Sequence, residues 1–280
     1  MNKRPIAITL GIAVLCALTL MPKLPRQCEA IVCVWVFDIG QGDAIYIDGQ
    51  DYDLVIDGGP TDMVVEKIGA ILYPWDTSID ATLMTHPDAD HMNGLAHLLG
   101  RYRILNVFDS LQAGSSAEYA AYEELSGPRR QGLHAGDRLE LGGGAYLEIV
   151  YPEQTFDRNK LSDPNGASII AILHVGDQAM LLTGDAGVEQ EREIVNSLPD
   201  IDVLKVGHHG SRTSTSAELL EAAKPEIAII PAGKDNDYGH PHPDVVDRLL
   251  EYGVTVYQTN LHGDIRIDFG QEITVKRFSL

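Results

Sequence analysis

Histidine and aspartate side chains crowd into one short segment of the sequence, Thr85-His86-Pro87-Asp88-Ala89-Asp90-His91. Four side chains of metal-binding type fall within six residues here: His86, Asp88, Asp90 and His91. Imidazole and carboxylate groups at this density are typical of a metal site, although a solvated acidic turn can also contain Pro-Asp and Asn-Gly pairs. Because an apolar run precedes the segment and a helical pattern follows it, we expect a loop at the end of a strand, where α/β folds place their chemistry.

Three further apolar, strand-like runs end in residues of the same types: Asp57, Asp185 and the pair His208-His209. Each has an ordinary explanation by itself, because an aspartate can cap a turn or a helix and a histidine can be satisfied within a core. Four such strand ends in one chain are much harder to explain in that way. Carboxylate and imidazole ligands without thiolate suit zinc, manganese or iron, and an anionic bridge such as Asp185 would join two close metal ions.

The apolar runs and turn signals that position these residues predict an α/β fold. A meander of three strands is expected first, over Ile31–Phe37, Ala44–Ile47 and Leu54–Ile56. Residues 110–140 show little pattern, and within them Arg129 and Arg130 are expected to be a solvated basic pair. Runs of strands followed by strand–helix alternation, in two halves, predict two sheets packed face to face with helices outside.

The N-terminal 30 residues differ in character from the rest of the chain. Lys3 and Arg4 precede an apolar run of about 16 residues, which is shorter than the roughly 20 residues that span a bilayer comfortably. Residues 1–30 are therefore expected to be a signal peptide, with Cys28-Glu29-Ala30 as a candidate cleavage site, or an anchor that attaches the protein to the membrane through residues 5–22. The leading positive charges predict that the following domain, residues 31–280, lies outside the cytoplasm, secreted or anchored.

Acidic residues dominate the composition of this 280-residue chain, with a formal net charge of −20 and a pI near 4.7. Such a balance argues against unspecific attraction to a polyanion, because nucleic-acid binding depends on basic residues that neutralise phosphates. Bound metal cations would have to attract a phosphate substrate locally. The three cysteines lie in or beside the N-terminal segment, so no disulfide framework and no thiolate metal site is expected in the body of the domain. No feature predicts a protein partner.

The motifs also carry a resemblance to a known family. The segment His86–His91 resembles the metal motif of the metallo-β-lactamase superfamily, and Asp57-Gly58-Gly59, Gly184-Asp185 and the late histidines match its other motifs in order. More narrowly, five segments resemble the extracellular metallo-hydrolase domain of ComEC-type competence proteins, here in a stand-alone form: Phe37–Asp43, Asn165–Ser168, Leu182–Asp185, Val203–Ser211 and Tyr238–Pro241. The likeness covers residues 31–277.

This resemblance implies an αββα four-layer sandwich with two divalent metal ions, zinc or manganese, in the cleft between the sheets. The implied metal ligands are His86, Asp88, Asp90, His91, Asp185 and His209. His86 and Asp88 would bind one metal, Asp90 and His91 the other, with Asp185 between them. Asp88 stands where the wider superfamily has histidine, and Asn165 stands near its mid-chain histidine ligand. The first metal position is therefore expected to be poor in nitrogen ligands.

Other positions receive catalytic or supporting roles from the same resemblance. The implied catalytic residues are Asp90, His208 and His240. His209 is preferred over His208 as the last ligand, and His240 either protonates a leaving group or is itself that ligand. Asp57, Asn165 and Ser211 are expected to support the site or contact the substrate, and Ser211 with Thr213 would bond a phosphate oxygen or cap the next helix.

The expected reaction is hydrolysis of a phosphodiester, nucleic acid first, by metal-bound hydroxide. Such a site needs no protein nucleophile, which agrees with the absence of a nucleophile-elbow motif from the sequence. A teichoic-acid phosphodiester or another extracellular ester is the alternative substrate, and β-lactam hydrolysis is less favoured. A different class of function is also open, in which the chain is a non-catalytic binding subunit of an envelope assembly.

Overall fold

The computed structural model describes residues 28–154 and 164–280. The signal peptide or anchor expected over residues 1–30 therefore falls almost wholly outside the described residues, as does the middle of the expected polar loop 152–166. Within the two described ranges, no helix combines the length and the apolar character needed to cross a membrane.

Eight strands form the first sheet, in the order β15-β14-β1-β2-β3-β4-β5-β6. Their bounds are β1 Val32–Val36, β2 Ala44–Asp48, β3 Asp53–Gly58, β4 Ser78–Met84, β5 Arg103–Asp109, β6 Arg130–Gly132, β14 Asp264–Phe269 and β15 Thr274–Phe278. The predicted meander is confirmed, because β1, β2 and β3 pair antiparallel in sequence order. From β3 to β6 the pairing is parallel, so the carboxyl ends of these strands share one edge of the sheet.

A second sheet of seven strands has the order β13-β12-β11-β10-β9-β8-β7. Its strands are β7 Arg138–Gly142, β8 Ala145–Tyr151, β9 Ile170–Val175, β10 Gln178–Leu182, β11 Val203–Lys205, β12 Ile227–Ile230 and β13 Thr255–Gln258. Strands β10 to β13 are parallel neighbours, so they too bring their carboxyl ends to one edge.

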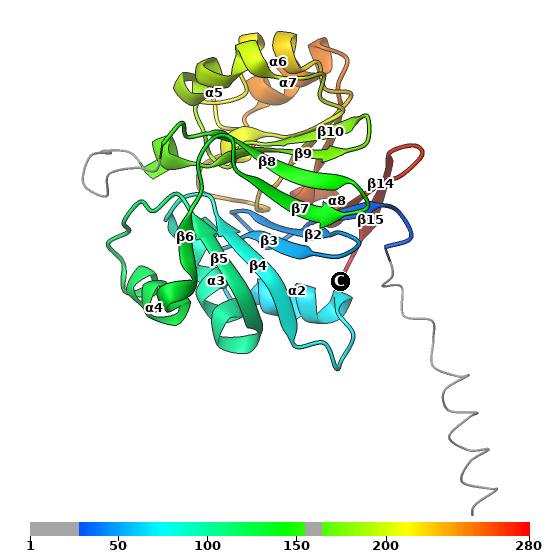
Figure 1. The fold of residues 1–280 in the computed structure, drawn as a ribbon. Coiled ribbons are helices and arrows are strands. Elements are labelled where there is room, and N and C mark those ends of the chain that lie inside the picture. Colours follow the sequence, from blue (N-terminus) through cyan, green and yellow to red (C-terminus); the bar gives the residue numbers. More distant parts are fainter. Residues whose placement is uncertain (1–27, 155–163) are drawn as a thin grey trace, which may run out of the picture.

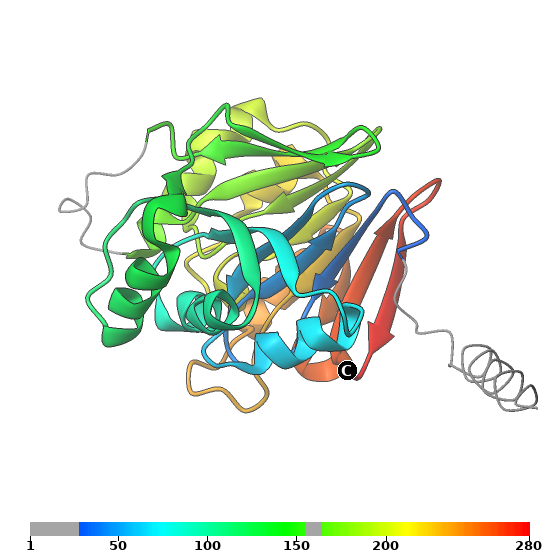
Figure 2. The same ribbon diagram turned by 60° about the horizontal axis from the view of Figure 1, so that its bottom comes forward.

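Helices cover the outer face of each sheet (Figures 1 and 2). Helices α2 Met63–Ile71, α3 Ala89–Arg101 and α4 Ala117–Ser126 lie over the first sheet, whereas α5 Val188–Ile194, α6 Ala217–Ala223 and α7 Pro243–Glu251 lie over the second. A short helix, α8 Thr259–His262, joins β13 to β14. The four layers are those of the predicted αββα sandwich, and that prediction is confirmed.

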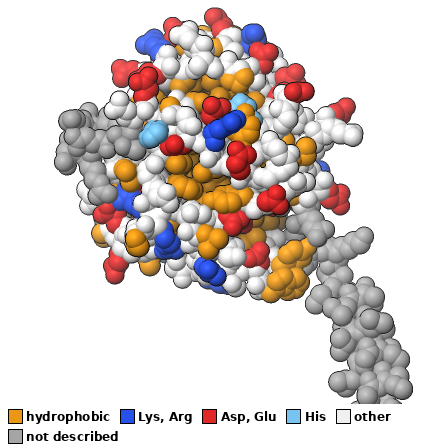
Figure 3. Space-filling model, in the orientation of Figure 1, with side chains coloured by type: hydrophobic (Ala, Val, Ile, Leu, Met, Phe, Trp, Pro, Cys, Tyr) orange, Lys and Arg blue, Asp and Glu red, His pale blue; other side chains and the backbone are white. Residues whose placement is uncertain are grey.

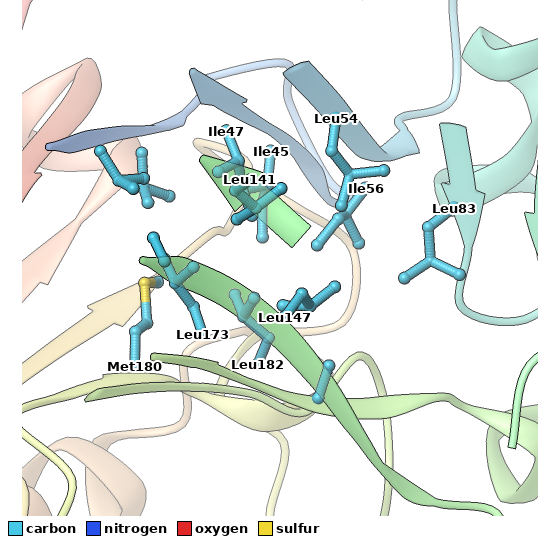
Figure 4. Close-up of a cluster of buried hydrophobic side chains, with 14 of the residues drawn as sticks. Ile45, Ile47, Leu54, Ile56, Leu83, Leu141, Leu147, Leu173, Met180 and Leu182 are labelled. Carbon is cyan, nitrogen blue, oxygen red and sulfur yellow. The ribbon is translucent and has the colours of Figure 1, made fainter. Parts of the chain in front are cut away.

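A layer of aliphatic side chains holds the two sheets together (Figure 4). Ile45 and Ile47 of β2 point into it, while the alternate residues Ala44 and Tyr46 pack toward the helices, as the two-residue period of a strand requires. Burying each Ile or Leu side chain contributes about 1.5–3 kcal/mol. This apolar layer fixes how the sheets face each other, and with that the distance between strand ends of different sheets.

The segment 110–140 departs from the sequence-based expectation. Arg130 is not solvated, because its guanidinium forms an ion pair with the buried Asp109 and donates to Glu123 Oε1 at 2.6 Å and Tyr119 Oη at 2.7 Å. The buried carboxylate at the end of β5 explains this, since a charge without water needs a charged partner. Arg130 thereby begins β6, within a segment whose sequence shows little pattern.

The cysteines also depart from expectation, because Cys28 and Cys33 form a disulfide bond with their Cα atoms 5.7 Å apart. Cys33 belongs to β1, so the bond ties the residues before the first strand to the body of the domain. This single bond beside the N-terminal segment was not predicted from the sequence. Cleavage after Ala30 would remove Cys28 and leave Cys33 unpaired.

Candidate metal centre

Strand ends from both sheets meet at one edge of the sandwich. Asp57 is the penultimate residue of β3 and His86 lies two residues after β4, both in the first sheet. From the second sheet, Asp185 follows β10 and His209 follows β11. All four side chains are buried, with at most 3% of their surface exposed. Residues that lie up to 152 positions apart in the sequence are thus neighbours in a protected site.

The segment Thr85–His91 is a loop only in its first half, because its second half belongs to a helix. Asp88 has extended backbone immediately before α3, and the helix begins at Ala89. Asp90 and His91 therefore lie in the first turn of α3, and the expectation that the whole segment precedes the helix is wrong. Consecutive residues of a helix point in different directions. His91 is therefore fully buried, whereas the side chain of Asp90 is 33% exposed at the rim.

Four donor atoms converge at the buried end of α3. The Nε2 atoms of His91 and His209 are 3.3 Å apart, and they lie 3.2 and 3.3 Å from Asp185 Oδ2. His209 Nε2 is also 3.4 Å from Asp90 Oδ2. Ligands of a tetrahedral metal bonded at 2.0–2.1 Å are about 3.3 Å from one another. The spacing of these atoms therefore fits a metal ion at their centre.

Hydrogen bonds orient both imidazoles so that Nε2 faces inward. His91 Nδ1 is 2.8 Å from Asp57 Oδ2, and His209 Nδ1 is 3.0 Å from the carbonyl oxygen of Pro231. A carboxylate and a carbonyl can only accept, so each Nδ1 carries the proton and each Nε2 has a free lone pair. Metal-binding histidines are commonly fixed by such partners, which set the tautomer and the ring orientation.

His86 offers a third imidazole, beside the first two. Its ring centroid is 4.2 Å from that of His91, and its Nδ1 is 3.0 Å from Thr85 Oγ1. Thr85 donates its own hydroxyl proton to Asp57 Oδ2 at 2.7 Å, so it accepts from His86. The buried Nε2 of His86 has no hydrogen-bond partner among the described residues and faces Asp88 Oδ2 at 3.7 Å. An orphaned nitrogen in this position fits a second, looser metal position.

Two buried charged residues complete the site, and the sequence reasoning assigned a role to neither. Lys205 Nζ forms an ion pair with Asp43, donates to the carbonyl oxygen of Gly184 at 2.7 Å and lies 3.7 Å from Asp185 Oδ1. Asp43 Oδ1 is in turn 3.3 Å from His209 Nδ1. A signal was present for Lys205, because lysine is almost never fully buried unless it is paired, and this one interrupts an apolar strand.

With the histidines neutral, as they are when they bind a metal, the charges of the site are out of balance. Five carboxylates (Asp43, Asp57, Asp88, Asp90 and Asp185) and one ammonium group leave a net charge of −4 when the histidines are neutral. Although burial opposes it, His209 and His91 hold the pKa of Asp185 well below its usual range. Asp185 correspondingly raises the pKa of both histidines, against the effect of burial. Two divalent cations would cancel this charge, so the donor set fits them.

At the rim, His208 faces outward beside its buried neighbour. Its side chain is 26% exposed, its Nε2 is 3.8 Å from Asp185 Oδ2, and its Nδ1 is 3.3 Å from Thr213 Oγ1. Thr213 Oγ1 is 3.0 Å from Ser211 Oγ, so Ser211 supports His208 through Thr213. The alternative that Ser211 and Thr213 cap the next helix is wrong, because Ser216 caps α6.

The remaining predicted residues lie around this group. The ring centroid of His240 is 5.6 Å from that of His208 and 6.4 Å from that of His209. Burial and the neighbouring His209 and His208 lower the pKa of His240 to about 4, so its ring is neutral at pH 7. Asn165 lies in the 3-10 helix Pro164–Ala167, and its backbone carbonyl oxygen accepts from the Ser168 N–H at 3.1 Å. Ser168 Oγ is 3.3 Å from His86 Nδ1 and accepts from the backbone of Asp185.

Unusual backbone geometry accompanies the site. Asp57, His208 and His209 have positive φ angles of 56°, 48° and 53°. Such left-handed conformations are uncommon for residues other than glycine and cost on the order of 1–3 kcal/mol when strained. They let the chain turn sharply at the ends of β3 and β11, so that Asp57 and His209 are buried in the site while His208 lies at its rim.

Comparison with known proteins is consistent with this geometry. A family profile described as the Metallo-beta-lactamase superfamily matches residues 37–234. ComE operon protein 3 of Bacillus subtilis (strain 168) is 31% identical over 263 residues, which cover 85% of this chain and 33% of that protein. Recombination protein 2 of Haemophilus influenzae is 29% identical over 267 residues, 94% of this chain and 32% of that protein. The chain spans about a third of the length of these relatives.

A solved structure shares the architecture as well. Tm1679, a metal-dependent hydrolase of the beta-lactamase superfamily, aligns with a TM-score of 0.55 at 15% identity, covering 86% of this chain and 100% of that chain. At such an identity the likeness establishes the fold alone, in agreement with the four layers described above.

Proposed function

This chain belongs to the metallo-β-lactamase superfamily, and we propose that it is a metal-dependent phosphodiesterase that acts on nucleic acid outside the cytoplasm. Its relatives include competence proteins, and it holds a buried site of histidine and aspartate side chains. The convergence of His91 Nε2, His209 Nε2 and Asp185 Oδ2 within 3.3 Å of one another is the observation that carries the proposal.

The donors divide into a tight and a loose metal position. Asp90, His91 and His209 would hold one divalent ion, and His86 with Asp88 would hold the other, with Asp185 between them. The mixture of nitrogen and oxygen donors suits zinc or manganese, and the net charge of −4 supports two ions. Bound there, divalent ions lower the pKa of a water molecule and polarise a phosphoryl oxygen.

The chain's own residues would then position the substrate and move protons. His208 is the exposed histidine closest to Asp185, and the Thr213 hydroxyl orients its ring. Burial lowers the pKa of His208, and His240 is neutral at pH 7, so neither ring is a cationic acid in the resting protein. We therefore assign His208 and His240 to accepting a proton from water or donating a hydrogen bond to a leaving oxygen, rather than to cationic acid catalysis.

Hydrolysis of bis(p-nitrophenyl) phosphate tests the proposal. Protein treated with a chelator should be inactive, and adding Mn²⁺ or Zn²⁺ should restore its activity. In the Asp185→Ala variant, the added metal should restore no activity. The matched control is Asp177→Ala, which removes an exposed aspartate from the turn before the same strand and should retain activity. Full metal-dependent activity in a folded Asp185→Ala protein would contradict the proposal.

The distribution of surface charge is a reason to assay a second class of substrate. On the face shown in Figure 3, lysine and arginine side chains are scattered among acidic ones and do not form one basic patch. Nucleic-acid binding usually relies on such a patch. Single-stranded DNA and a choline phosphodiester, a mimic of teichoic-acid esters, should therefore be assayed in parallel at low salt. Fewer than about one metal ion per purified chain would instead support a non-catalytic binding subunit.

A location outside the cytoplasm is supported by the bond between Cys28 and Cys33, since structural disulfides persist in oxidising compartments. If the leader is removed, we propose that cleavage occurs before Cys28, which keeps this bond. Mass spectrometry of the native, unreduced protein tests both points. A mature chain that begins after Ala30, or free thiols at Cys28 and Cys33, would contradict them.

A further inference from the structure

A row of rings leads from the buried centre to the surface along the loop that follows β12. His240 lies 6.4 Å from His209 and 5.6 Å from His208 between ring centroids. Tyr238 stacks on His240, with centroids 5.7 Å apart and ring planes inclined by 21°. Tyr238 is 67% exposed, so the row ends in an open aromatic ring at the mouth of the site.

The loop that carries Tyr238 is held by one side chain. Asn236 Oδ1 accepts from the backbone N–H groups of Tyr238 at 3.1 Å and His240 at 3.0 Å. Asn236 Nδ2 donates to the carbonyl oxygens of Gly233 at 2.9 Å and His240 at 2.6 Å. These four bonds fix the backbone on both sides of Tyr238. The fixed backbone and the stacking on His240 therefore present the exposed ring of Tyr238 in a defined place.

Basic side chains near this ring are few among the described residues. Lys234 is exposed in the same loop, where Asp235 and Asp237 oppose its charge. Arg212, which lies between Ser211 and Thr213, is ion-paired with Asp244 at 2.9 Å, and both side chains are about half exposed or more. The chain as a whole is strongly acidic. A phosphodiester that reaches the site therefore needs attraction beyond basic side chains. Stacking of bases on aromatic rings supplies it in proteins that bind single strands, without requiring a particular base.

We propose that Tyr238, supported by His240, stacks on a nucleobase next to the phosphodiester being hydrolysed. The inference rests on the proposed phosphodiesterase function and narrows its substrate to base-bearing, single-stranded phosphodiesters. Tyr238 is then a specificity-determining residue, because a polyol phosphodiester has no planar ring to place on it. Phenylalanine at this position keeps the stacking face, whereas alanine removes it.

Two substrates separate stacking from other roles. A short thymidine oligonucleotide and the same oligonucleotide with abasic positions carry identical phosphates. In the wild-type protein, the KM for the abasic strand should exceed that for the base-bearing strand by about tenfold, in line with alanine substitutions of stacking residues. Tyr238→Ala should bring this ratio close to one, and Tyr238→Phe should restore it. Tyr252→Ala, which removes an exposed tyrosine at the end of α7, should keep the wild-type ratio.

A binding measurement keeps the inference separate from catalysis. An oligonucleotide containing 2-aminopurine loses fluorescence when its base stacks, so quenching by wild-type and Tyr238→Phe proteins but not by Tyr238→Ala supports the stacking site even if no phosphodiester is cleaved. Such a result without hydrolysis would overturn the proposed function alone. Hydrolysis with a KM ratio and quenching that do not change in Tyr238→Ala would overturn the stacking site alone.

Discussion

The first sheet presents aspartate clusters at both of its ends, and only one of the two clusters faces imidazoles. At the end formed by the carboxyl termini of β3 and β4, Asp57 lies among histidines and near Lys205. At the other end, Asp48, Asp53 and Asp80 line a cavity of about 760 Å³ whose lining includes neither histidine nor lysine nor arginine. In the sequence, Asp48 and Asp57 look alike, because each lies near the end of a strand and directly before glycine.

The partners decide the ionisation of each cluster. At the metal end, burial raises the pKa of Asp57, whereas His209 and His91 lower the pKa of Asp185, which therefore stays ionised despite its burial. At the opposite end, burial and the nearby Asp80 raise the pKa of Asp53 to about 7, and burial raises that of Asp48 to about 6. A group of carboxylates is therefore not sufficient for a metal site. Converging imidazole donors, each fixed by a partner, make the difference.

Removing one imidazole should give the largest contrast between the two ends. His209→Ala should lower metal-dependent phosphodiesterase activity by at least about a hundredfold, because even residues behind the ligands contribute about 10- to 100-fold. Asp53→Asn at the opposite end should stay within about twofold of wild type. Steady-state kinetics with metal content measured on the same samples checks both, and equal losses in the two variants would remove the contrast.

The second largest effect is expected from the buried ammonium group of Lys205, which is found at the metal end. Lys205→Met leaves Asp43 buried without its partner and should lower the free energy of unfolding by about 3–5 kcal/mol. It should also weaken metal binding, because Lys205 Nζ no longer positions Asp185 and the neighbouring Gly184 carbonyl, an effect that we expect to exceed the gain from removing a repelling positive charge. Lys276→Met is the matched control: its ammonium group pairs with Asp268 but is half exposed, so the change should be below about 1 kcal/mol.

Chemical denaturation and metal titration measure these effects separately. The double variant Lys205→Met with Asp43→Asn should recover part of the lost stability, since no unpaired buried charge remains. If Lys205→Met were as stable as Lys276→Met, the buried ion pair would not be a structural requirement of the metal end.

The disulfide bond should matter for stability but not for the metal. Cys28→Ala with Cys33→Ala should lower the free energy of unfolding by about 2 kcal/mol, the loop-closure value for so short a separation. Because the bond lies at the end of the sheet away from the histidines, the metal content should not change. Reduction of the wild-type protein is the control and should shift the denaturation midpoint in the same direction. A loss of metal on reduction would show that the two ends are coupled.

The smallest effect concerns pH at the acidic end. With its pKa raised to about 7, Asp53 keeps a proton in the folded protein that the unfolded chain releases above about pH 4. Unfolding therefore releases a proton between about pH 4 and 7, and the free energy of unfolding falls as the pH rises through this window. Asp53→Asn should remove about 1 kcal/mol of this decline, allowing for partial exposure to solvent.

Thermal or chemical unfolding of the metal-loaded protein at pH 5 and pH 8 measures the decline. The exposed Asp51 in the neighbouring turn provides the control variant Asp51→Asn, which should keep the wild-type pH dependence. A decline of the same size in Asp53→Asn would assign the pH dependence to other groups.

Much of this protein follows from its sequence, for physical reasons. Compact apolar runs separated by turn signals predicted the strands, and the repetition of strand–helix alternation in two halves predicted two sheets packed face to face. Parallel strands bring their carboxyl ends to one edge, so metal-binding residues at the ends of four runs predicted one shared site. The motif around His86 gave the family by resemblance, and the profile match agrees with it.

Other features depend on contacts that only the folded chain makes. The sequence gives no reason to bury His209 and expose His208, and the left-handed turn after β11 decides this. The sequence indicates only that Lys205 lies in a strand; the packing of the second sheet against the first brings it to Asp43. Packing of the apolar layer sets that distance between sheets, and local sequence carries no information about it. Which nitrogen faces the site, and which aspartates remain ionised, were therefore decided by tertiary structure.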